Sequence, residues 1–139
     1  MSSSEFVDLL YQASRVLIAG TAAHLASAVY WMILMTYSKS FSGIQQPRSS
    51  LPYWIAFVSY IALALLFALC VYYSPVVNHI NVLQGLWFAV RLSGLIALLQ
   101  LNIRAYDLET EQQRIVFVLD MLCQTLVISV IATVLVVMK

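Results

Sequence analysis

The chain has 139 residues, of which 63% are hydrophobic and only 9% are charged, and its mean hydropathy is +0.91. Soluble domains carry about one quarter charged residues, so this composition excludes an ordinary soluble fold and indicates an integral membrane protein. The net charge is +1 and the basic residues are scattered along the chain, which argues against a nucleic-acid partner. The chain has no polybasic cluster of the kind that binds lipid headgroups.

Four apolar segments, each long enough to cross a bilayer, follow one another along the sequence. We therefore predict an all-α fold, with four antiparallel transmembrane helices in an up-down bundle with short loops, and a single transmembrane domain over residues 1–139. The start MSSSEFVDLL lacks the basic region of a secretory signal, so the first segment is expected to remain as a helix. The predicted spans are 14–37, 52–73, 80–103 and 113–138.

The first predicted span is rich in small residues, and helices with such faces pack closely in lipid. We expect Gly20, Ala23 and Ser27 to lie in helix contacts, together with Gly94 of the third span. This pattern makes the first span the expected central packing element of the bundle.

Residues that favour helix starts precede two of the spans. The serines at 2–4, followed by Glu5, suit an N-cap and first turn, so a helix is expected to begin ahead of the first span. Asp107 or Thr110 can cap the fourth helix, and Gln113 completes a capping-box pattern after Thr110.

The connection at 74–79 is long enough only for a tight hairpin, in which Pro75 ends one helix and Asn78 can start the next. The second and third spans should therefore be antiparallel neighbours. The longest loop covers 38–52, and Pro52 suits the first turn of the second helix.

Basic residues favour one orientation over the other. The two larger loops carry more of them than the opposite side, so these loops should face the cytoplasm or the matrix, with both termini on the other face. We expect the inner membrane of a mitochondrion or a bacterial plasma membrane. The charges compared are Lys39, Arg48, Arg104 and Arg114 against Arg15 and Lys139.

Three ionisable residues lie within the predicted spans: His24, Arg91 and Asp120. An uncompensated arginine at mid-bilayer costs at least about 2.5 kcal/mol on insertion scales, so Arg91 should face protein or trapped water. Asp120 and Gln124 share a helix face because they are four residues apart. We expect Arg91 to reach Asp120 directly, or through Gln124 or a water. Such a pair predicts an interhelix or intersubunit clamp, with a proton or ion relay as the alternative.

Other reactive groups are sparse. His24 lies among alanines, which favours a neutral histidine bonded to a neighbour over a haem or pigment ligand, because the second histidine, His79, falls at the interface. Cys70 and Cys123 differ in depth by about 10 Å on a helical rise, too far for a disulfide. We predict no cofactor and no metal site, and we expect bound lipid.

The acidic residues at 107, 109 and 111 fit a solvated loop and helix start, and no nucleophile–base arrangement or glycine-rich phosphate loop is present. The preferred hypothesis is therefore a non-catalytic structural or accessory subunit of a larger membrane complex, with a respiratory or other energy-converting assembly as host. Its partners would be other integral membrane subunits and lipids. One alternative is a small homo-oligomeric transporter or channel using Arg91, Asp120 and Gln124, and another is a membrane anchor that binds haem or pigment through His24.

Overall fold

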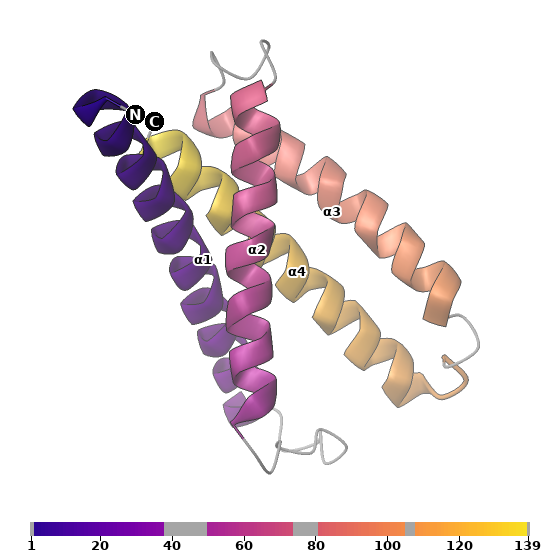
Figure 1. Cartoon of the computed structure of the whole chain (residues 1–139). Coiled ribbons are helices and arrows are strands. Elements are labelled where there is room, and N and C mark those ends of the chain that lie inside the picture. The colour runs from indigo at the N-terminus through magenta and orange to yellow at the C-terminus, as the bar shows by residue number, and fades with distance from the viewer. Residues whose placement is uncertain (1, 38–49, 74–80, 105–107, 139) are drawn as a thin grey trace.

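The computed structural model describes residues 2–37, 50–73, 81–104 and 108–138, and within them it contains four α-helices packed as a bundle (Figure 1). All four are long and apolar enough to cross a membrane, which confirms the predicted fold. The predictions for Pro75, Asn78, His79 and the 38–49 loop lie outside the described residues. The helices are α1 (Ser3–Tyr37), α2 (Leu51–Tyr73), α3 (Val82–Arg104) and α4 (Glu111–Val137).

Three of the helices begin with a pair of reciprocal hydrogen bonds. The side chain of the first residue accepts from the backbone N–H three residues later, and the side chain of that later residue accepts from the backbone N–H of the first. At α4 the Thr110 hydroxyl accepts from the Gln113 backbone at 3.2 Å, and Gln113 accepts from the Thr110 backbone at 3.1 Å, as predicted. These local bonds satisfy backbone donors that a helix start leaves open. The other two pairs are Ser2 with Glu5 and Asn81 with Gln84.

Helix α4 occupies the centre of the bundle, because it contacts α1, α3 and α2. We expected the first span to have this position, and that prediction was wrong: α1 contacts α4 and α2 but does not pack along α3 among the residues described. The reason lies in the buried residues of α4, which form two adjacent helical rows and so allow packing on both sides. They are Cys123, Val127, Ile128, Ile131, Ala132 and Leu135.

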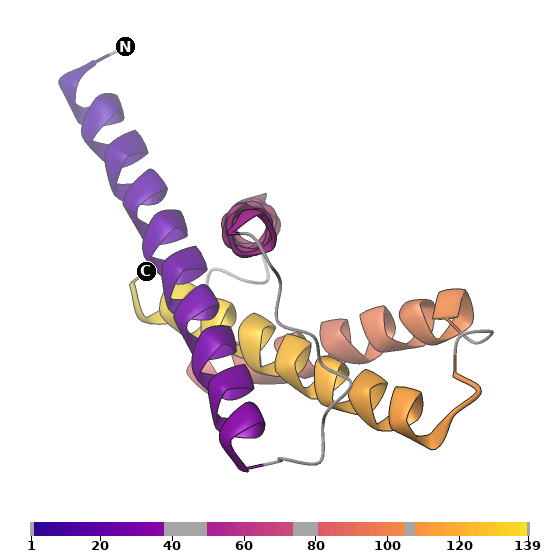
Figure 2. The ribbon, with the colours of Figure 1, turned by 90° about the horizontal axis from the view of Figure 1, so that it is seen from below.

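Helix α2 packs mainly on α1, and the two helices approach closely at Gly20, whose missing side chain leaves room for Ile61. We predicted that α2 and α3 are antiparallel neighbours, but among the described residues these two helices do not pack along each other. Their ring contact is that of Phe67 with Phe88, at a centroid distance of 5.5 Å. Figure 2 shows why: α3 runs beside α4, and α2 stands apart from α3.

Candidate functional site

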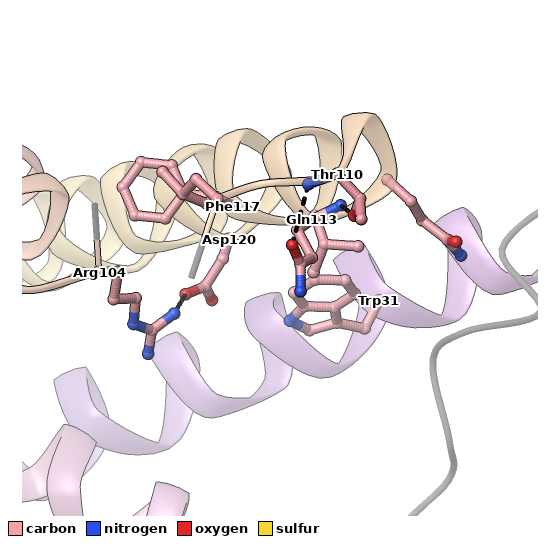
Figure 3. Close-up of a pocket in the computed structure, with 9 residues that line it drawn as sticks. Trp31, Arg104, Thr110, Gln113, Phe117 and Asp120 are labelled. Atoms are coloured by element: carbon pink, nitrogen blue, oxygen red, sulfur yellow. Dashed lines mark hydrogen bonds and ion pairs between the residues drawn. The ribbon is translucent and has the colours of Figure 1, made fainter. Parts of the chain in front are cut away.

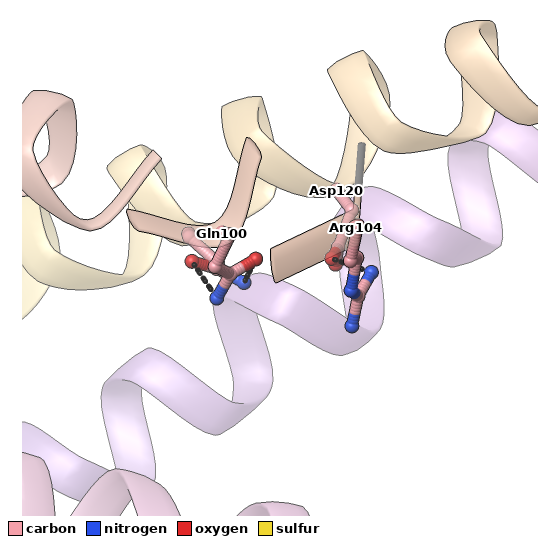
Figure 4. A network of polar contacts seen from close by, with 4 residues as sticks. Gln100, Arg104 and Asp120 are labelled. Carbon is pink, nitrogen blue, oxygen red and sulfur yellow. Dashed lines mark hydrogen bonds and ion pairs between the residues drawn. The ribbon is translucent and has the colours of Figure 1, made fainter. Parts of the chain in front are cut away.

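Two polar pairs, one helical turn apart, join α3 to α4. The amides of Gln100 and Gln124 exchange hydrogen bonds, each Nε2 donating to the Oε1 of the other at 3.3 and 3.4 Å. One turn further along α3, Nη1 of Arg104 lies 3.7 Å from Oδ2 of Asp120 (Figure 4). From Gln100 to Arg104 the number rises by four on α3, and from Gln124 to Asp120 it falls by four on α4. Both pairs therefore fit one antiparallel alignment of the two helices.

This register shows that the predicted pairing of Arg91 with Asp120 was wrong. Arg91 precedes Arg104 by 13 residues, which is about 20 Å along a helix, so it lies far from Asp120. Gln124 likewise pairs with Gln100 and not with Arg91. The prediction estimated the depth of each residue from the ends of its span, whereas the two pairs place the end of α3 beside the first half of α4.

A pocket of about 650 Å³ opens beside the ion pair, between the end of α3, the start of α4 and Trp31 of α1 (Figure 3). The side chains of Arg104 and Asp120 are 51% and 30% exposed, so the described protein encloses the pair only in part. An ion pair with such exposure contributes at most about 1 kcal/mol. The pocket offers hydrogen-bond donors and acceptors to a small polar ligand or ion, and its other polar lining residues are Thr110, Gln112 and Gln113.

Arg91 lies on the face of α3 that points away from α4. The residues of α3 that are buried are Gly85, Ala89 and Ser93, and Arg91 is exposed. In the part of the chain that the structure describes, no carboxylate lies within 4 Å of its guanidinium.

His24 is half-buried between α1 and α2, where it contacts aromatic rings. Its ring centroid lies 5.4 Å from that of Phe57 and 5.8 Å from that of Tyr60. Its Nδ1 atom is buried and has no hydrogen-bond partner among the described groups. The absence of haem or pigment here stays a prediction, which the visible absorption spectrum of the purified protein would test.

Ser27 lies where α1, α2 and α4 meet, and it joins a small network of hydroxyl and thiol groups. The Tyr60 hydroxyl donates to Ser27 Oγ at 3.0 Å, and Ser27 Oγ lies 3.4 Å from Sγ of Cys123, a buried free thiol. Nearby, the Tyr30 hydroxyl donates to the Leu119 carbonyl at 2.7 Å. These bonds tie three helices together and satisfy polar groups that lipid would leave unpaired. The side chain of Cys70 lies outside the described residues.

The two predicted packing glycines have opposite surroundings. A Cβ added to Gly20 would lie 2.8 Å from Cα of Ile61, whereas one added to Gly94 would meet nothing within 4 Å. Ala23, also predicted to pack, is fully buried. Gly94 therefore makes no helix contact within the described protomer.

Arg15, which the sequence marks only as a charge flanking the first span, has a structural role that was not predicted. Arg15 is buried, and its Nη2 donates to the Leu135 carbonyl in the last turn of α4. The Tyr11 hydroxyl donates to the Met138 carbonyl beside it. Two side chains of α1 thus cap the end of α4, where a cation also favours the helix dipole. An arginine near the end of a predicted span suggests that it caps a helix, but the sequence does not show which helix end its side chain contacts.

Comparison of the chain with family models, curated proteins and solved structures found no match. Among the residues described, no group of three or more His, Cys, Asp or Glu side chains could hold a metal ion.

Proposed function

We propose that this chain is a non-catalytic subunit of a larger multi-subunit membrane complex. The observation that carries the proposal is the outward position of Arg91 near the middle of α3, about 14 Å from the start of that helix and about 20 Å from its end. Facing lipid alone, this arginine would cost at least about 2.5 kcal/mol. A neighbouring subunit that pairs with it removes that cost.

Small and polar residues on other outward faces support the same proposal. Contacts between membrane helices favour small residues, because backbones can then approach closely. Within α1, α2 and α3, several such residues are exposed near the middle of the helix, where a protein neighbour would gain most from them. They are Thr21, Ala28, Ser59 and Gly94.

Native electrophoresis after mild detergent extraction tests the proposal. We expect the 15.6 kDa chain to migrate within a much heavier assembly that contains other membrane proteins. A monodisperse band at the mass of the protomer or of a small homo-oligomer would contradict it. For the host, we propose the energy-converting assembly of an inner membrane expected from the sequence, and the co-purifying subunits would identify it.

The pocket beside Arg104 and Asp120 favours a second candidate, a small homo-oligomeric transporter or channel. The polar lining of the pocket and the Gln100–Gln124 pair, one helical turn away, would form a path for a small polar solute or ion. Flux into proteoliposomes should then depend on the carboxylate and fall in Asp120→Asn. No flux from the wild-type chain, or flux that Asp120→Asn leaves intact, would remove this candidate.

A further inference from the structure

One outward stripe of α3 combines a charge, an open notch and large apolar side chains. Its members are four, three and four residues apart, a spacing that places them on one face of a helix. Trp87 is 60% exposed and Leu98 is 67% exposed, so neither is covered within the protomer. We call this set the Arg91 stripe, and it consists of Trp87, Arg91, Gly94 and Leu98.

Gly94 forms the notch in this stripe. A Cβ added there would meet no atom of the described residues within 4 Å, so these residues do not need a glycine at this position for packing. Because it has no side chain, another helix backbone could approach α3 closely at this point. Arg91 lies about one turn before Gly94 on the same face of α3, so its long side chain can reach a helix that packs there.

No acidic group of the described chain is placed to pair with Arg91. Asp120 pairs with Arg104, about 20 Å further along α3. A symmetric contact between the α3 helices of two copies would bring like charges together, and the remaining described acids lie at helix ends, away from this level. They are Glu5 and Asp8 near the start of α1, Glu109 just before α4 and Glu111 in its first turn.

We propose that the Arg91 stripe is the docking surface for a transmembrane helix of a different subunit, which carries an Asp or Glu at the depth of Arg91. The carboxylate accepts hydrogen bonds from the guanidinium, and the helix backbone packs into the notch at Gly94. This inference rests on the proposed function and names the chemistry of the partner. In the low-dielectric interior such a pair fixes the position of one helix against the other.

The test uses the tagged full-length chain, purified with its native assembly in mild detergent. Arg91→Glu and Gly94→Leu should each lower the amount of co-purifying partner subunit at least about tenfold, whereas Arg91→Lys should keep most of it. Ala62→Leu, on the exposed face of α2, is the control of similar added size and should change nothing. The partner lost must contain an acidic residue within a span, and replacing that residue by arginine should restore binding to Arg91→Glu.

Several outcomes would overturn the inference, and they separate it from the proposed function. If Arg91→Glu and Gly94→Leu both retain the whole assembly, the stripe is not the docking surface, although the chain remains a subunit. A photo-crosslinker at Leu98 that captures only lipid or a second copy would also overturn it. A wild-type chain that migrates alone would overturn both proposals. Unchanged helical circular dichroism in each variant shows that loss of the partner is not loss of the fold.

Discussion

Replacing Gly20 by alanine tests the close contact between α1 and α2. The added Cβ would lie 2.8 Å from Cα and 2.8 Å from Cγ1 of Ile61. Carbon atoms in favourable contact are about 3.5 to 4.0 Å apart, so the two helices must separate by on the order of 1 Å. A new rotamer of Ile61 does not relieve the overlap, because one of the contacted atoms belongs to the backbone. Overpacking of this kind costs about 1 to 3 kcal/mol.

Gly94→Ala is the matched control, because its added Cβ meets no atom within 4 Å in the part of the chain that the structure describes. Both variants gain about 1 kcal/mol of helix propensity, so the difference between them isolates the steric overlap. In an SDS titration of the detergent-solubilised chain, followed by circular dichroism, Gly20→Ala should have the lower free energy of unfolding by about 1 to 3 kcal/mol. Equal free energies of unfolding for the two variants would refute the close contact.

Three further substitutions test single contacts. Thr110→Ala removes the capping box of α4 and should lower the free energy of unfolding by about 1 kcal/mol. Thr110→Ser keeps the hydroxyl and should retain most of that free energy. Equal losses in the two variants would contradict the capping role of the Thr110 hydroxyl. Asp120→Asn should cost at most about 1 kcal/mol, and less at high salt, because the pair with Arg104 is partly exposed. Thermal unfolding in a non-ionic detergent at two salt concentrations measures this, and a much larger, salt-independent loss would argue for a buried pair. Arg15→Met removes the donor to the Leu135 carbonyl and should cost about 1.5 to 3 kcal/mol in the SDS titration; an unchanged stability would exclude the capping role.

Features that depend on local sequence were predicted well. The four spans follow from runs of apolar residues, because an apolar helix in lipid needs no partner to satisfy its backbone. The capping box of Thr110 and Gln113 also follows from local sequence, since its hydrogen bonds join residues three apart. The intramembrane polar residues were found by composition, but their partners were not.

The partners depend on how one helix is shifted and rotated against another. The alignment of α3 with α4 pairs Asp120 with Arg104 and places Arg91 on the outer face of α3. Counting residues along one helix cannot predict either result. The burial of Arg15 against the end of α4 is of the same kind.

The sequence by itself determined that this is an all-α chain with four spans and few intramembrane charges, because hydropathy and capping act within one segment. Only the tertiary structure decided that α4 is central, that Gly20 is packed while Gly94 is open, and that Arg91 faces outward. All four helices are mostly apolar, with apolar residues on buried and exposed faces alike, so hydrophobicity alone does not specify which face meets which neighbour. Close packing and a few long-range hydrogen bonds make that choice.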